Sequence, residues 1–254
     1  MQHLIRYDCH VHTISSPCGK PDMTLRDIVE QARRLKLAGL CLTDHRHPET
    51  ERDQFVRLRA AADAASRSDM PLWVGCEAEL LTVGTFSIKP TDLSLVDLVL
   101  VAPFHGDYCE DRPKGETEEE IADFMLRLLN SALDCPGARI IVHPLWMAME
   151  WPFDLERVIK RMLSSPAMTN LLKKAATAGI AMEVNPKMLN GPFIGLAEPF
   201  YLRCLDQNVK LSFGSDAHTL PRMDVWNDFE RFFDKLGADV SEDLWLPNVQ
   251  LLPV

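Results

Sequence analysis

The residues best suited to chemistry near the start of the chain are two histidines, His10 and His12. They follow the short apolar run Leu4-Ile5 and lead into a polar turn at residues 15–19. Side chains two positions apart on a strand point to the same side, so both imidazoles can reach one object together. Two imidazoles at a strand end suit a divalent metal ion, although an isolated pair of this kind also arises by chance.

Residues of the same kind recur after further short apolar runs. Six of the eight histidines follow predicted strands, and only His3 and His47 do not. Glu77 and Asp216 also lie at or just past the ends of predicted strands. Chance does not readily explain so many ligand types at strand ends, so the pattern predicts a polynuclear metal site. The predicted set is His10, His12, His45, Glu77, His105, His143, Asp216 and His218.

The elements that must position these residues alternate between strands and helices. After the first strand, apolar runs predict strands at 40–43, 72–79, 97–102, 138–143, 180–185 and 209–214, with an extra strand or hairpin arm at 82–88. Helical spacing predicts helices at 25–35, 50–67, 117–133, 154–178 with a break at 164–166, 196–207 and 225–236.

Sustained alternation of this kind indicates an α/β protein with a parallel sheet. A (β/α) barrel carries its reactive groups at the C-terminal ends of many strands, as here. A doubly wound open sheet is the alternative, and it would focus the site at one switch point.

Composition and charge narrow the class of protein. The 254 residues are 46% hydrophobic and 25% charged, as in a globular protein, and no Gly, Ser or Pro linker divides them, so a single domain over residues 1–254 is expected. No run of about 18 apolar residues predicts a membrane span. The chain opens directly into a strand without an apolar signal segment, so a cytoplasmic location is expected. A net charge of -10 argues against nucleic acid as a partner.

The cysteines do not indicate a disulfide framework, because their number, seven, is odd and no Cys-x-x-Cys pair occurs. Cys9, Cys41 and Cys76 lie in apolar runs and are expected in the core.

Five motifs together resemble the PHP (polymerase and histidinol phosphatase) family of metal-dependent phosphoesterases. They are Asp-x-His-x-His-Thr at residues 8–13, Thr43-Asp44-His45, Gly75-x-Glu77, His143-Pro144 and Gly214-Ser215-Asp216-Ala217-His218. The resemblance covers nearly the whole chain. It implies a distorted seven-stranded (β/α) barrel of the TIM-like, PHP type that binds two to three divalent ions of zinc, manganese or iron.

The resemblance also implies which residues hold each ion. The first ion would be held by His10, His12, Glu77 and Asp216, which are the predicted catalytic groups. Glu77 would bridge to a second ion held by His105 and His143. His45 and His218 would hold the third ion together with Cys18, whose position the family often fills with His or Asp. A thiolate is a good zinc or iron ligand, but Cys18 can also be an ordinary turn thiol.

Several neighbouring residues have two interpretations. Asp8 and Asp44 either orient ligand imidazoles or cap strand ends. Glu79 shares a strand face with Glu77 and competes for its role, although the Gly-x-Glu match favours Glu77. Glu183 and Asn185 either line the pocket or end a solvated strand.

Clustered divalent metals suit the hydrolysis of a phosphate ester, through a hydroxide formed from a bridging water. No serine nucleophile motif or phosphate-binding glycine loop is present. Arg46, Lys187 and Arg222 follow strand ends and are candidates to contact the phosphate, as are Arg112 and Lys114 from the polar loop 106–116. The same loop follows a strand end, so it is expected to overhang the metal site and narrow access to it.

The leading interpretation is a phosphoesterase that hydrolyses a small phosphate monoester with histidinol-phosphatase-like chemistry. A phosphodiesterase or nuclease is the second interpretation, and the acidic balance counts against it. A non-catalytic metal-binding domain is disfavoured by the nearly complete ligand set. A metal-dependent amidohydrolase also uses His-x-His in a barrel, but the Thr-Asp-His motif fits it less well.

Overall fold

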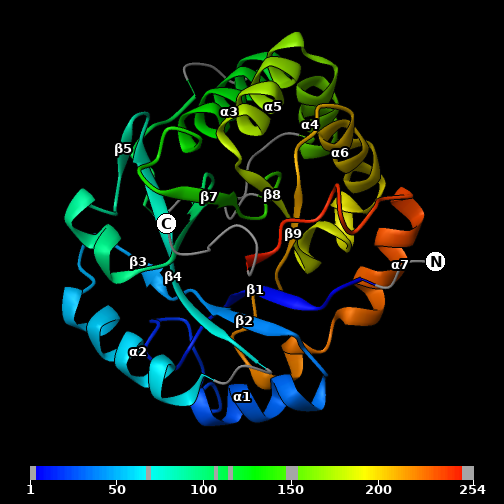
Figure 1. Ribbon diagram of the computed structural model, residues 1–254. Coiled ribbons are helices and arrows are strands. Elements are labelled where there is room, and N and C mark those ends of the chain that lie inside the picture. The colour runs from blue at the N-terminus through cyan, green and yellow to red at the C-terminus, as the bar shows by residue number, and fades with distance from the viewer. Residues whose placement is uncertain (1–3, 67–69, 106–107, 114–116, 147–153, 248–254) are drawn as a thin grey trace.

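The computed structural model describes residues 4–66, 70–105, 108–113, 117–146 and 154–247. Seven parallel strands form its main sheet (Figure 1). In sheet order they are β1 (Tyr7–Val11), β2 (Gly39–Leu42), β4 (Leu72–Thr82), β6 (Leu98–Ala102), β7 (Ala138–Ile141), β8 (Ala181–Val184) and β9 (Leu211–Phe213).

The first and last strands meet and nearly close the sheet into a barrel. Val11 forms a parallel bridge with Ala217, just after β9. His12 N donates to Ala217 O at 3.1 Å, and Asp216 N donates to His10 O at 2.8 Å. The distorted seven-stranded (β/α) barrel is therefore confirmed, and the doubly wound open sheet is wrong.

The helices surround the barrel (Figure 1). They are α1 (Leu25–Arg34), α2 (Arg52–Ala65), α3 (Glu118–Ala132), α4 (Leu155–Ser164), α5 (Pro166–Ala178), α6 (Ile194–Asp206) and α7 (Trp226–Leu236). The predicted break at 164–166 separates α4 from α5. Ser165 is extended there and caps α5, and Pro166 takes the first position of that helix, where its missing N–H costs nothing. None of the described helices is long and apolar enough to cross a membrane.

Short elements extend the strand ends. β3 (His45–Arg46) pairs with β4, and β5 (Thr85–Phe86) pairs antiparallel with β4, which confirms the hairpin arm predicted at 82–88. Four 3-10 helices occur in the described loops, at η1 (Pro90–Leu95), η2 (Pro186–Met188), η3 (Gly191–Phe193) and η4 (Leu220–Met223).

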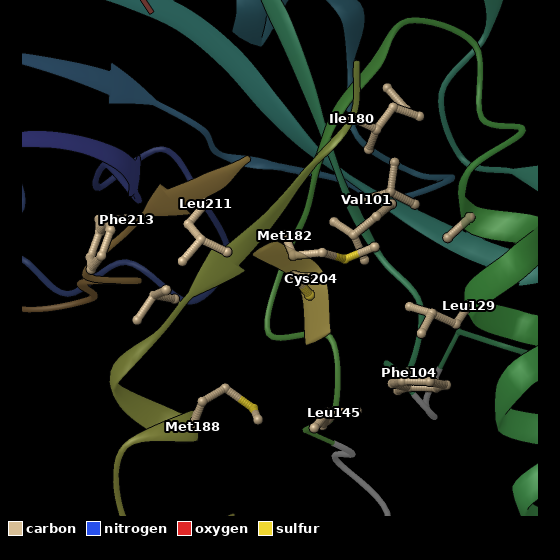
Figure 2. Packing of buried hydrophobic residues seen from close by; sticks show 14 of the residues in the cluster. Val101, Phe104, Leu129, Leu145, Ile180, Met182, Met188, Cys204, Leu211 and Phe213 are labelled. Atoms are coloured by element: carbon tan, nitrogen blue, oxygen red, sulfur yellow. The ribbon is translucent and has the colours of Figure 1, made fainter. Parts of the chain in front are cut away.

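The core has two layers because strand side chains alternate. Val99 and Val101 of β6 belong to the cluster that packs against the helices, whereas Leu98, Leu100 and Ala102 belong to a second cluster. Figure 2 shows Val101 of β6 and Met182 of β8 on the side of the sheet that faces Leu129 of α3.

The second cluster includes Cys9, Cys41 and Trp245. Leu244 pairs with Leu211, the first residue of β9, so Trp245 fills the barrel near the N-terminal ends of the strands. Cys9, Cys41 and Cys76 are all buried, as predicted. The packed N-terminal end leaves the C-terminal ends of the strands to carry the polar residues.

Candidate metal centre

The predicted ligand residues converge at the C-terminal ends of the strands. His10 lies on β1, His45 on β3 and Glu77 on β4, and the others lie in the segments that follow strands. A cavity of about 360 Å³ opens at this point. Residues from seven different segments line it, including Cys18, His45, Glu77, His105, Asp216 and His218.

Glu77 lies at the centre of the cluster and is buried. Its Oε2 atom lies 3.1 Å from His45 Nδ1, and its Oε1 atom lies 3.1 Å from His143 Nε2. Three further histidine nitrogens, 3.4, 3.5 and 3.8 Å away, belong to His10, His12 and His105. Burial by itself raises the pKa of Glu77, but the surrounding imidazolium charges hold it well below its usual range. Glu77 is therefore an anion that all these imidazoles share.

Asp216 faces the same histidines from the end of β9. Its Oδ1 atom lies 3.4 Å from His12 Nε2 and 3.8 Å from His10 Nε2. Its Oδ2 atom accepts a hydrogen bond from Lys187 Nζ at 2.5 Å. The backbone φ is 52° at Asp216 and 31° at His143, a region that residues other than glycine rarely adopt. Such conformations are common at functional sites, where the surrounding structure imposes them.

Cys18 lies among three of the histidines. The ligand atoms of His12, Cys18, His45 and His218 all lie within 4.8 Å of one another. Burial raises the pKa of the Cys18 thiol, but hydrogen bonds from His12, His218 and His45 outweigh burial and lower the pKa to about 3. Cys18 is therefore a thiolate at neutral pH, which is the form that binds metal.

Glu183 holds the ring of His10 in place. Its Oε1 atom lies 2.7 Å from His10 Nδ1, and its Oε2 atom accepts hydrogen bonds from His143 N at 2.8 Å and Asn185 Nδ2 at 3.0 Å. The arrangement leaves His10 Nε2 facing Glu77. Glu183 and Asn185 are both buried, so the interpretation of a solvated strand end is wrong.

Gly214 permits the close contact between Glu183 and His10. A Cβ atom at this position would lie 2.3 Å from Glu183 Oε1 and 2.5 Å from His10 Cβ. Both neighbours are buried and cannot move aside easily. We therefore expect Gly214→Ala to lower the free energy of unfolding by about 1–3 kcal/mol and to weaken metal binding about 10-fold or more.

Thermal unfolding and a metal titration measure both effects of the Gly214 substitution. The matched control is Gly195→Ala in α6, where a Cβ atom would meet nothing within 4 Å. Equal metal affinity in the two variants would show that Gly214 does not position His10.

Asp8 and Asp44 act on the backbone. Asp8 Oδ1 accepts hydrogen bonds from His10 N at 3.3 Å and Ser215 N at 2.9 Å. Asp44 accepts two hydrogen bonds from Thr13, one from its N–H at 2.6 Å and one from its hydroxyl at 2.7 Å. These contacts fit the capping interpretation, because they brace the segments that carry the histidines.

His47 is a member of the cluster that the strand-end rule missed. Its Nδ1 atom lies 2.9 Å from the Tyr108 hydroxyl, and its Nε2 atom lies 3.4 Å from Glu79 Oε1. The sequence does contain a pattern that predicts this position, because His47 follows His45 at the same i, i+2 spacing as His12 follows His10.

Glu79 and Glu77 both face the cluster rather than competing for one position. Glu79 is buried, with Oε1 3.1 Å from His45 Nδ1 and Oε2 2.8 Å from His105 Nδ1. Burial raises the pKa of Glu79, but His105 and the other histidines hold it well below its usual range. Glu79 therefore adds a second anion on the same strand.

The cluster fits divalent cations. Glu77 Oε2 is buried and accepts no hydrogen bond within the described part of the chain, although His10, His12 and His45 nitrogens lie 3.1–3.5 Å away. Two ligand atoms bound to one tetrahedral ion at ordinary zinc distances lie roughly 3.3–3.5 Å apart. The spacing of these atoms matches that of ligands around a shared ion.

The predicted basic residues differ in where they lie. Lys187 lines the cavity, with Nζ 4.1 Å from the centroid of the Trp146 ring. Burial lowers the pKa of Lys187, but the Asp216 carboxylate raises it above its usual range, so Lys187 stays a cation. Trp146 also lines the cavity and had no signal in the sequence.

Three other basic residues do not reach the cavity. Arg46 is buried, and its guanidinium pairs with Asp92 at 3.0 Å, so the expectation that it contacts a substrate phosphate is corrected. Arg222 is exposed on η4, and Arg112 donates to carbonyl groups of its own loop. Lys114 lies outside the described residues. Tyr108 from the same loop lines the cavity.

Comparison with known proteins finds similarity in sequence and in fold. No family model matches the chain. The chain is 28% identical over 221 residues to a protein of Syntrophotalea carbinolica named "probable phosphatase", covering 83% of this chain and 79% of that protein. The structure of the present chain is similar to that of histidinol phosphate phosphatase of Lactococcus lactis, solved with zinc, L-histidinol and phosphate. The TM-score is 0.67 and the sequence identity is 15%. That similarity covers 93% of this chain and 95% of the phosphatase.

The chain has a PHP-type barrel. The resemblance that its motifs carry is confirmed. The similarity in sequence to a probable phosphatase supports a hydrolase. A similar fold also occurs in a chain of archaeal ribonuclease P solved with mature tRNA, at a TM-score of 0.52 and 14% identity, covering 91% of this chain and 82% of that one.

Proposed function

We propose that this chain is a metal-dependent phosphomonoesterase that acts on a small phosphorylated metabolite. The observation that carries the proposal is the buried carboxylate of Glu77 among histidine nitrogens at ligand spacing, at the C-terminal end of a PHP-type barrel. Similarity to a phosphatase in sequence and to a histidinol phosphate phosphatase in fold supports it. A single domain and a cytoplasmic location stay predictions from the sequence.

Two to three divalent ions would be held by the residues that the family resemblance implies. One group is His10, His12, Glu77 and Asp216. A second is Glu77 with His105 and His143, and a third is Cys18, His45 and His218. Bound divalent ions supply a nucleophile from water at neutral pH and neutralise phosphate oxygens.

The other residues of the cavity orient the ligands and the substrate. Glu183 holds the His10 ring, and burial followed by the Lys187 charge lowers the pKa of His143 to about 4, so its imidazole is neutral and able to bind metal. Lys187 would contact a phosphate oxygen, because its ammonium group lines the cavity beside Trp146. The ammonium group lies over the face of the indole ring, a cation–π contact that helps to hold it in place.

Cavity size favours a compact substrate over a polymer. A volume of about 360 Å³ is at the small end of the range for ligand pockets, and rings of His47, Tyr108 and Trp146 form part of its lining. Lys187 is the only Lys or Arg among the described lining residues. A nucleic acid strand needs several cations along its backbone, whereas one phosphate group does not.

We therefore expect hydrolysis of small phosphate monoesters to exceed cleavage of a single strand of about ten nucleotides by at least tenfold in kcat/KM. This ratio corresponds to about 1.4 kcal/mol of transition-state preference. The zinc- or manganese-loaded protein should be assayed against a panel of phosphorylated metabolites and oligonucleotides at matched salt. A better rate with the oligonucleotide would favour a nuclease, which the similarity to a ribonuclease P chain makes the second candidate.

A further inference from the structure

One ring nitrogen of His47 forms a hydrogen bond, and the other forms none with the described residues. The ring is 5% exposed, and the Tyr108 hydroxyl lies 2.9 Å from Nδ1. The Nε2 atom is buried and has no hydrogen-bond partner among the described residues, although Glu79 Oε1 lies 3.4 Å away. A buried nitrogen and a carboxylate oxygen at this separation, without a hydrogen bond between them, are placed as two ligands of one cation are.

Glu79 presents one of its carboxylate oxygens to both His45 and His47. Its Oε2 atom lies 2.8 Å from His105 Nδ1, and this contact occupies one side of the carboxylate. Its Oε1 atom lies 3.1 Å from His45 Nδ1 and 3.4 Å from His47 Nε2. These separations are close to the roughly 3.3–3.5 Å between two ligands of one tetrahedral zinc ion. The ligand atoms of His45, His47 and Glu79 therefore already lie at the spacing of a metal site.

Tyr108 provides the partner that a metal-binding histidine needs. Such a histidine usually donates its second ring N–H to an oxygen, which fixes the tautomer and the ring orientation. If His47 Nδ1 donates to the Tyr108 hydroxyl, the Nε2 lone pair points towards Glu79. The two rings stack at 4.1 Å between centroids, which holds His47 in this orientation.

We propose that His45, His47 and Glu79 form a further divalent-cation site beside the main centre, with Tyr108 orienting His47. Two histidines and a glutamate are a ligand set of zinc sites that keep an open position. The open position faces the cavity, because His45 and His47 both line it. The inference rests on the proposed metal centre only through His45, which also belongs to the third proposed group. With both ions bound, the imidazole of His45 would bridge them through its two ring nitrogens as an imidazolate, after losing its N–H proton.

The site can be tested by titrating metal-free protein with Zn²⁺ against a zinc-binding indicator. The wild type should bind one equivalent more than His47→Gln. Tyr108→Phe should keep that equivalent but bind it about 10–100-fold more weakly, because it removes the oxygen that orients the ring. The matched control is Glu49→Gln, since that carboxylate lies 3.6 Å from His47 Nδ1 but its side chain is 68% exposed and outside the ligand set.

The possible outcomes separate this site from the main centre. Equal stoichiometry and affinity in wild type, His47→Gln and Tyr108→Phe would overturn the further site and leave the proposed function intact. A wild type that binds no zinc would overturn both. Circular dichroism checks the fold of each variant, and Tyr108→Phe alone decides the question if His47→Gln does not fold.

Discussion

Replacing Glu77 with glutamine is expected to lower kcat/KM for a small phosphate ester about a thousandfold, or roughly 4 kcal/mol of transition-state stabilisation. The carboxylate lies 3.4 Å from His10 Nε2 and 3.1 Å from His143 Nε2, so it faces the first and second proposed ion positions at once. An amide keeps the shape but supplies neither the charge nor a second anionic oxygen. Metal content should therefore fall by more than one ion per chain.

Elemental analysis and steady-state kinetics on the same preparation measure the two effects of Glu77→Gln. Glu30→Gln is the control, because its side chain is 62% exposed on α1 and pairs only with the neighbouring Arg26 at 3.3 Å in the described structure. Wild-type metal content in Glu77→Gln would remove the central argument for the metal centre, whatever the activity.

Alkylation of Cys18 in metal-free protein should be nearly independent of pH between about pH 5 and 8. A pKa of about 3 keeps the thiol ionised across this whole interval. The thiolate fraction of an ordinary cysteine, with a pKa near 8.5, falls about tenfold for each pH unit below that value. The ratio of the Cys18 alkylation rate to that of an ordinary thiol should therefore rise roughly 10³-fold as the pH is lowered from 8 to 5. The sign follows from the lowered pKa, since protonation would begin only as the pH approaches 3.

Iodoacetamide labelling followed by peptide mass analysis measures this rate at each pH. The other six cysteines are buried and should stay unlabelled, and Cys18→Ser is the control for background. Added Zn²⁺ should protect Cys18 if the thiolate is a ligand of the third ion. A rate that falls tenfold per pH unit, or labelling unaffected by zinc, would contradict the ligand role.

Most of the fold could be predicted because its signals are local. Each main strand is a short apolar run, and each helix has an apolar face with 3.6-residue spacing. The strand limits moved by a few residues, since pairing with neighbours decides where a strand stops. β4 continues to Thr82, beyond the predicted 79, because β5 pairs with its end. The pairing of β1 with β9 joins residues about 200 positions apart, and only the recurrence of ligands at strand ends pointed to it.

The sequence predicted those site residues that follow strand ends. It did not predict the residues whose position depends on partners far away in the chain. His47 follows β3, which consists of two residues and exists because it pairs with β4. Arg46 has the sequence context of a phosphate ligand, but its partner Asp92 comes from η1, an element with no apolar pattern. Trp146 reaches the cavity through a loop, and no periodicity reports where a loop side chain points.

The contact between β1 and the segment after β9, which closes the barrel, is short, so the proposed ions would help to stabilise it. β1 and β9 are joined by the Val11–Ala217 bridge and a few backbone hydrogen bonds, whereas β4 and β6 pair along five residues. His10 and His12 stand on one side of this seam, and Asp216 stands on the other, with Oδ1 3.4 Å from His12 Nε2. An ion bound by all three would cross-link β1 to the segment after β9, where few backbone contacts close the barrel. Amide hydrogens beside the seam should then exchange with solvent faster when the ions are removed, while those between β4 and β6 keep their protection.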